Sequence, residues 1–126
     1  MEIIIRNASS QPIYAQIAGQ IKAQILSGEL QPGEALPSIR ALAKDLKISV
    51  ITTKRAYDEL EAAGFLDTVA GKGCFVAEKN LELLRERQLA EMEQRLSEAV
   101  TLAKRNGVDF AELRETLRLI WEEEET

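Results

Sequence analysis

The chain has 126 residues, 45% of them hydrophobic and 29% charged, and a formal net charge of −5. This balance predicts one small folded domain with an appendage and excludes a disordered chain. No apolar run approaches the roughly 20 residues of a membrane span, and the N-terminus lacks a basic signal start, so we expect a cytoplasmic protein. One cysteine and no histidine leave no zinc cluster, and we expect neither metal nor cofactor.

The negative charge is unevenly distributed. Residues 1–79 contain nine basic and nine acidic side chains, whereas residues 80–126 contain seven and twelve. Within residues 38–55, five basic side chains stand against a single acid, Asp45. This local excess of four positive charges permits contact with a polyanion, which the net charge alone would argue against.

A first helix is expected after Pro12, because apolar residues recur at positions 14, 17, 18, 21, 25 and 26 and Gly28 comes after them. A loop over 30–37, with two prolines and a glycine, separates it from a short helix capped by Ser38. That helix ends at a tight turn over 47–48, immediately before a second capping serine, Ser49.

The stretch "ISVITT" (48–53) has five β-branched residues in six, which is typical of a strand. A helix that starts at Ser49 accounts for more of the residues between this stretch and Gly64. Gly64 can end this helix. Its inward positions have helical spacing: Thr53, Ala56, Tyr57 and Leu60. β-Branching lowers helix propensity by only tenths of a kcal/mol per residue, less than the burial of one leucine supplies, so we expect a helix.

The rest of the chain is expected to form a hairpin and two more helices. Two β-like runs, "FLDTV" and "CFVAE", flank a glycine-rich tip, "AGKG" (70–73). Asn80 can begin a long helix that ends at "RNG" (105–107), and Asp109 with Glu112 forms an acidic capping box for the last one. The predicted fold is therefore mainly α: a winged helix-turn-helix domain over 1–79, with three helices plus a β-hairpin wing, followed by a two-helix dimerisation region over 80–126.

The tail helices carry apolar stripes that a monomer would leave in water. Because two helices bury little by themselves, we expect the stripes to meet in an isologous homodimer. The residues assigned to this interface are Leu89, Met92, Leu96, Ala99, Phe110, Leu113, Leu117, Ile120 and Trp121. In a winged helix-turn-helix domain the second helix of the pair, here the one that begins at Ser49, is the recognition helix that enters the DNA groove. A dimer would place two recognition helices about 34 Å, or a multiple of that distance, apart on DNA, which predicts a palindromic operator.

Three features of the winged pattern suit contact with double-stranded DNA. The helix that begins at Ser49 presents free N–H groups to phosphate. Cationic side chains, at Arg40, Lys54 and Arg55, lie near the two helix starts. The tip formed by Gly71, Lys72 and Gly73 can bring bare backbone and one ammonium group to a minor groove.

The phrases "QPIYAQIAGQIKAQILSGELQPGEALPSIRALAKDL", "TTKRAYDELEAAGF" and "GKGCFV" resemble the DNA-binding domain of GntR-type bacterial transcriptional regulators, over about residues 11–77. The short tail resembles that of the YtrA-like subfamily. This resemblance implies a dimeric regulator without a large effector-binding domain that often controls a transporter operon. It also implies that Ser38 and Arg40 touch DNA, that Ser49, Thr52 and Lys54 lie on the DNA side of the recognition helix, and that Gly71 and Lys72 form the wing tip.

The sequence departs from the family pattern directly after Ser49. Many members have an arginine or another polar residue there, often followed by asparagine, whereas this chain has Val50 and Ile51. Contact with thymine methyl groups is the physical substitute for polar base readout, so both residues are assigned to the DNA side. For Arg55, an ion pair with Glu59 is as good an expectation as phosphate contact, and Arg40 could instead pair with Asp45.

These patterns predict a sequence-specific transcriptional regulator, a repressor, rather than an enzyme, because no nucleophile with its base and no catalytic carboxylate pair is evident. The alternative is a winged-helix module that binds another protein through its apolar tail. A small-molecule effector is not indicated, because the chain lacks the length for a separate effector domain, although a groove beside the tail helices could admit an apolar molecule.

Overall fold

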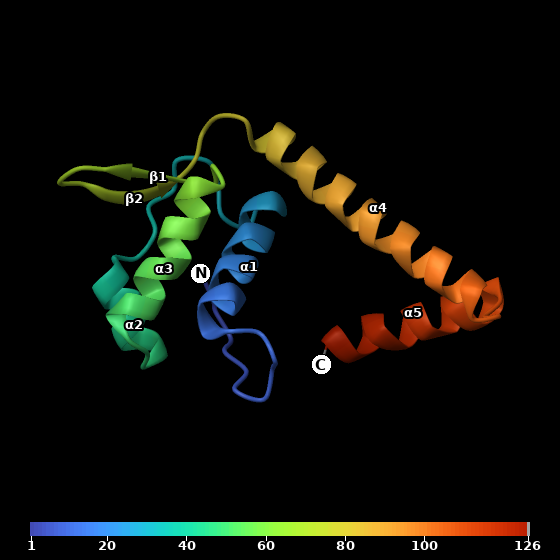
Figure 1. Cartoon of the computed structure of the whole chain (residues 1–126). Coiled ribbons are helices and arrows are strands. Elements are labelled where there is room, and N and C mark those ends of the chain that lie inside the picture. The colour runs from blue at the N-terminus through green and yellow to red at the C-terminus, as the bar shows by residue number, and fades with distance from the viewer. Residues whose placement is uncertain (126) are drawn as a thin grey trace. The chain divides into compact units, whose positions relative to one another are not determined.

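The computed structural model describes residues 1–125. Its elements are α1 (Ile13–Leu26), α2 (Ile39–Leu46), α3 (Val50–Ala62), β1 (Leu66–Val69), β2 (Gly73–Val76), α4 (Leu81–Arg105) and α5 (Phe110–Glu125) (Figure 1). This confirms the mainly helical fold with a hairpin wing. The chain divides into two compact units, Met1–Arg85 and the residues from Glu86 onward. Within the described range, every helix is too short or too polar to cross a membrane.

The turn between α2 and α3 is as short as the sequence predicts. The Ser38 hydroxyl caps α2 by accepting a hydrogen bond from the Ala41 N–H at 3.0 Å. Lys47 ends the helix in a left-handed conformation with φ of 56°, and the Ile48 N–H donates to the Ala43 carbonyl at 3.0 Å. The chain therefore turns within two residues, Lys47 and Ile48, and α3 begins directly after Ser49.

The segment with five β-branched residues in six is the beginning of helix α3, as predicted. Its four expected inward residues are all buried: Thr53, Ala56, Tyr57 and Leu60. Thr53 is fully buried although it is polar, because its hydroxyl donates to the Ser49 carbonyl at 3.1 Å. Gly64 comes after the helix with φ of 88°, the left-handed conformation expected where α3 ends.

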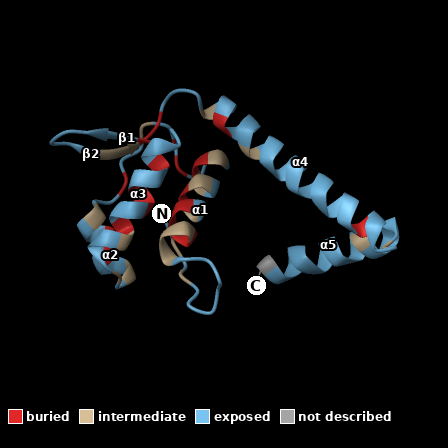
Figure 2. Ribbon diagram, viewed as in Figure 1, coloured by how far each residue is buried: buried red, intermediate tan, exposed pale blue. Residues whose placement is uncertain are grey.

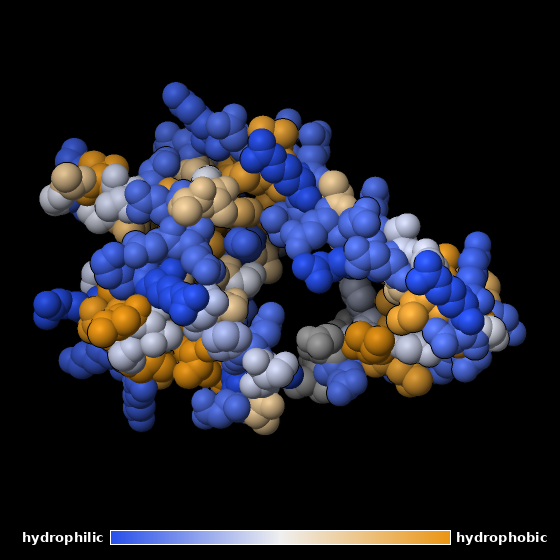
Figure 3. Space-filling view, viewed as in Figure 1, coloured by the Kyte–Doolittle hydropathy of each residue, from blue (hydrophilic) through white to orange (hydrophobic). Residues whose placement is uncertain are grey.

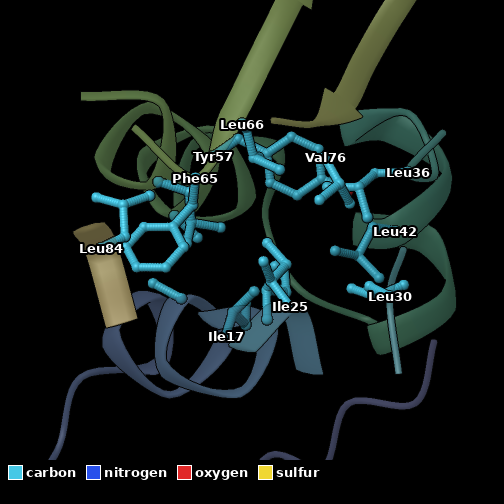
Figure 4. Packing of buried hydrophobic residues seen from close by; sticks show 14 residues of the cluster. Ile17, Ile25, Leu30, Leu36, Leu42, Tyr57, Phe65, Leu66, Val76 and Leu84 are labelled. Carbon is cyan, nitrogen blue, oxygen red and sulfur yellow. The ribbon is translucent and has the colours of Figure 1, made fainter. Parts of the chain in front are cut away.

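A single apolar core holds the first unit together. Figure 4 shows its side chains converging from α1, α2, α3, the hairpin and the first turn of α4, and in Figure 2 buried residues lie on the facing sides of α1 and α3. The labelled members are Ile17, Ile25, Leu30, Leu36, Leu42, Tyr57, Phe65, Leu66, Val76 and Leu84. Burying each large apolar side chain contributes roughly 1.5–3 kcal/mol, so this core fixes the orientation of α3.

The hairpin is anchored at its base and free at its tip. β1 and β2 pair antiparallel, with Leu66 opposite Val76 and Val69 opposite Gly73. An isolated bridge between Ala35 and Phe75 joins the loop before α2 to the same sheet. Figure 1 shows the hairpin projecting from the domain on the side away from α1. The buried base therefore sets the direction in which the tip extends.

The N-terminal segment lies along α1, an arrangement that the sequence patterns did not predict. Three glutamines on successive turns of α1 bond to alternate residues of the extended segment: Gln24 to Glu2, Gln20 to Ile4 and Gln16 to Arg6. Gln20 and Gln16 each donate to the backbone carbonyl and accept from the backbone N–H of one residue. The side chains supply the pairing that a neighbouring strand would otherwise give to this backbone.

From Glu86 onward the unit consists of the remainder of α4 and α5, joined by a tight turn. The Val108 N–H donates to the Ala103 carbonyl at 2.9 Å. Asp109 caps α5 by accepting from the Glu112 N–H at 2.9 Å, as the sequence predicts. Figure 1 shows α4 and α5 diverging from this turn. Most of the apolar side chains of both helices consequently remain uncovered within one chain.

Tyr57 gives the core a pH dependence that can be measured. Its hydroxyl donates to the Pro37 carbonyl at 2.7 Å, which ties the loop before α2 to α3, and burial raises the pKa of Tyr57. Because this pKa is raised in the folded state, Tyr57 contributes fully to the free energy of unfolding below about pH 10, where an unfolded tyrosine ionises. The contribution is lost as the pH rises further.

We expect Tyr57→Phe to lower the free energy of unfolding at pH 7 by about 0.5–1.5 kcal/mol, because the Pro37 carbonyl loses its donor. The variant should also lose less stability than the natural protein between pH 9 and about pH 11. Urea unfolding at pH 7, 9 and about 11 measures the two effects. An equally steep alkaline decline in both proteins would contradict this role of Tyr57.

Candidate nucleic-acid interface

The first turn of α3 is held by hydrogen bonds between its own side chains. The Ser49 hydroxyl accepts from the Thr52 N–H at 3.1 Å and donates to the Thr52 hydroxyl at 2.8 Å. This confirms Ser49 as the N-cap of the helix. The two hydroxyls thus order the helix start before any ligand is present.

Val50 and Ile51 face solvent beside this cap. Their exposed fractions are 45% for Val50 and 82% for Ile51, whereas Thr52 is half-buried. Both apolar side chains therefore point away from the core, as the assignment of these positions to the outer face requires. The core on the opposite side of α3 keeps them there.

Lys54 lies one turn further along α3 and is paired within the helix. Its Nζ lies 2.7 Å from the Asp58 carboxylate, and the two side chains are 61% and 57% exposed. The hydrogen bond from Lys54 and the charge of Asp58 raise the pKa of Lys54. The spacing i, i+4 is the signal that could have revealed this pair in the sequence. Because the pair is exposed, a phosphate can compete with Asp58 for the ammonium group.

Arg55 packs against Tyr14, a contact that neither of the two expectations from the sequence named. Its guanidinium lies over the ring of Tyr14, with Cζ 3.7 Å from the ring centroid, and its Nη2 donates to the Tyr14 hydroxyl at 3.1 Å. Among the described residues it forms no ion pair with Glu59. Stacking of a planar guanidinium on an aromatic face explains the position, and the contact joins α3 to α1.

Ser38 and Arg40 lie at the start of α2. The Ser38 hydroxyl accepts from a backbone N–H of its own helix, so its demonstrated role is capping. Arg40 is exposed, and within residues 1–125 it forms no ion pair, neither with Asp45 nor with another acid. Arg40 is therefore a charged side chain that can turn to a phosphate without first breaking an internal contact.

The hairpin tip is open on all sides. Gly71 and Gly73 have φ of 75° and 111°, and a Cβ built on either one meets no atom within 4 Å. Only the positive φ values therefore require glycine in the free protein. Lys72 between them is exposed, and its N–H closes the turn by donating to the Val69 carbonyl at 2.9 Å.

The assigned interface residues of α4 and α5 form an exposed apolar surface. Phe110 and Trp121 are 74% and 68% exposed, and Leu113 is half-buried. Figure 3 shows hydrophobic side chains at the surface where α4 and α5 meet. The other members are all exposed: Leu89, Met92, Leu96, Ala99, Leu117, Ile120. One chain alone does not cover this surface.

The assigned DNA contacts all lie on the first unit, whereas the assigned dimer contacts all lie on α4 and α5. Two side chains near the first set were missed, Tyr14 and Asp58. Asp58 could have been found from its spacing to Lys54, whereas Tyr14 meets Arg55 only because α1 packs on α3. Among the described residues, no three side chains of the metal-binding types come together.

Two capped helices in a tight turn, a buried scaffold behind the second and a hairpin after it define the winged helix-turn-helix class. The family model for bacterial regulatory proteins of the gntR family matches residues 13–76. The chain belongs to the GntR family and is a DNA-binding transcriptional regulator of that family.

Individual relatives support this assignment. The chain is 35% identical over 112 residues to the HTH-type transcriptional repressor YtrA of Bacillus subtilis (strain 168), covering 89% of this chain and 86% of YtrA. It is similar to the structure of a transcriptional antiterminator from Listeria monocytogenes EGD-e, with TM-score 0.76, 34% identity and coverage of 95% and 90%. It is also similar to the AraR DNA-binding domain in complex with operator ORX1, with TM-score 0.54, 30% identity and coverage of 61% and 96%.

The known relatives are named as regulators of transcription and not as enzymes. They do not favour the alternative of a winged-helix module that binds only protein. The YtrA-like resemblance of the tail agrees with the extent of the match to YtrA, which covers most of both chains.

We expect Ser49→Ala to lower the free energy of unfolding by about 0.5–2 kcal/mol, because the Thr52 N–H loses its acceptor at the start of α3. Ser10→Ala is a matched control, since Ser10 is exposed and lies outside the helices. Urea unfolding of the three proteins measures the difference. Equal stability of Ser49→Ala and the control would contradict the capping role.

Proposed function

We propose that this chain is a transcriptional repressor that binds a palindromic operator as a homodimer, with α3 in the major groove and the hairpin tip in a neighbouring minor groove. The observation that carries the proposal is the division of α3 into a fully buried inner face and an exposed, capped start. A helix held in this way can enter a groove without rearrangement. The relative AraR, whose domain is seen with an operator, supports the same use of the fold.

The DNA contacts in this proposal fall into three groups. Ser38 and Arg40 meet the backbone near α2, and Lys72 with its two flanking glycines enters the minor groove. The recognition helix contributes the third group: Ser49, Val50, Ile51, Thr52, Lys54 and Arg55. Within it, Arg55 keeps its contact with Tyr14 and uses its remaining N–H groups for phosphate, because a guanidinium has five donors.

The exposed apolar surface of α4 and α5 supports the proposed homodimer. Monomers rarely expose large contiguous apolar patches, and a second copy offers a matching surface. Two-fold symmetry would then present two α3 helices to two half-sites, which accounts for a palindromic operator. The resemblance of the tail to YtrA-like regulators makes a transporter operon the proposed target.

Random-site selection with the full chain tests the proposed function directly. We expect it to enrich a sequence with two inverted half-sites, and we expect the affinity for that sequence to fall steeply with salt, since phosphate contacts release counterions. Selection that enriches no sequence would overturn the proposal.

The proposed backbone contacts lead to a prediction about Arg40 and Lys72. We expect Arg40→Ala and Lys72→Ala each to weaken binding and to reduce the slope of log affinity against log salt by about 1, if each removes one phosphate contact. A base contact would instead appear as a loss of about 1–3 kcal/mol with relaxed preference at one position.

Titrations by fluorescence anisotropy at several salt concentrations measure both quantities. Lys104→Ala provides the control, because Lys104 is an exposed lysine near the end of α4. Affinity and salt slope that stay unchanged in both test variants would refute the assignment of these two residues to the DNA interface.

The proposed dimer leads to a prediction about Leu96, which is 41% exposed on α4. We expect Leu96→Asp to weaken self-association at least tenfold, because it places a charge within the buried apolar centre of the interface. Thr101→Asp adds the same charge on another face of α4 and should leave association unchanged. Sedimentation equilibrium measures both, and a natural protein that sediments as a monomer at micromolar concentration would disprove the dimer.

A further inference from the structure

The start of α3 exposes apolar side chains where recognition helices commonly carry polar ones. Ile51 is 82% exposed and Val50 is 45% exposed, and the two are adjacent in the first turn. Single exposed apolar residues are common on protein surfaces and need no explanation. These two, however, lie in the first turn of α3, which the proposed function places against base edges. The packing of the opposite face of α3 in the core keeps them exposed.

The polar groups around them are already paired within the protein. The Ser49 hydroxyl both accepts and donates within the first turn. Lys54 is bonded to Asp58, and Arg55 is stacked on Tyr14. The first turn of α3 contains no arginine, lysine, asparagine or glutamine, the side chains that form bidentate bonds to guanine or adenine.

We infer that α3 reads its operator through thymine methyl groups, with Ile51 as the main specificity-determining residue and Val50 beside it. This inference rests on the proposed function. The C5 methyl of thymine is the apolar group that a base edge presents in the major groove, and it distinguishes T·A from C·G without a hydrogen bond. Both side chains are β-branched and stiff, so they lose little conformational freedom when they pack against a methyl group.

Replacement of thymine by deoxyuridine tests the inference, because it removes the methyl group and keeps base pairing. The operator obtained by random-site selection is resynthesised with deoxyuridine at each half-site thymine in turn. For the natural full-length protein, we expect one or two positions per half-site where the replacement weakens binding about fourfold, which corresponds to one buried methyl group. Other positions should show no change.

The variant Ile51→Ala links the effect to this residue. We expect it to bind the natural operator more weakly and, at one or more of the sensitive positions, to bind the thymine and deoxyuridine operators equally well. Any effect of deoxyuridine on the DNA itself would persist in this variant. The comparison therefore separates such an effect from the loss of the contact between Ile51 and the methyl group. Ile4→Ala removes an apolar side chain that is 56% exposed on the N-terminal segment, and it should keep the full discrimination.

The outcomes separate the inference from the function on which it rests. Binding of the selected operator that is insensitive to deoxyuridine at every half-site thymine would overturn the inference and leave the proposed function intact. Discrimination that persists at every sensitive position in Ile51→Ala would overturn it as well. Failure to select any sequence would overturn the proposed function, and the inference with it. Because Ile51 is exposed, its variant should melt at the same temperature as the natural protein, which circular dichroism verifies.

Discussion

The packing of α3 against α1 is the interaction on which the candidate site depends. Thr53, Ala56, Tyr57 and Leu60 bury one face of α3, and the Tyr57 hydroxyl ties the loop before α2 to the same helix. With that face fixed, the direction of every other side chain of α3 is set by helical geometry. The exposure of Ile51 is thus a consequence of core packing several residues away. The core therefore fixes the positions of the candidate site residues, as precise binding sites require.

The polar side chains of the candidate interface are ordered by contacts with each other. The hydroxyls of Ser49 and Thr52 bond to each other, Lys54 pairs with Asp58, and Arg55 stacks on Tyr14. Preorganisation of this kind lowers the entropy that binding must remove. We propose a division of roles along α3, in which the internally paired polar groups supply order and charge and the apolar pair at the start contacts the bases.

The local parts of the fold could be predicted from the sequence. Ser38 and Ser49 were identifiable as caps because capping depends on residues three positions away, and the spacing of the inward residues of α3 indicated a helix. Contacts between distant segments could not be predicted. Tyr14 and Arg55 are 41 residues apart, and the glutamines of α1 pair with an N-terminal segment that lies up to 22 residues away. Such contacts depend on tertiary packing, which periodicity in one sequence does not encode.

The proposed function requires that two copies of the chain present α3 to two halves of one operator. Hydroxyl-radical footprinting on a selected operator measures this arrangement, since it maps protected sugars on both strands. We expect two protected segments related by two-fold symmetry, with centres about 10 base pairs or a multiple apart. A single protected segment, or two segments in direct repeat, would contradict the symmetric dimer.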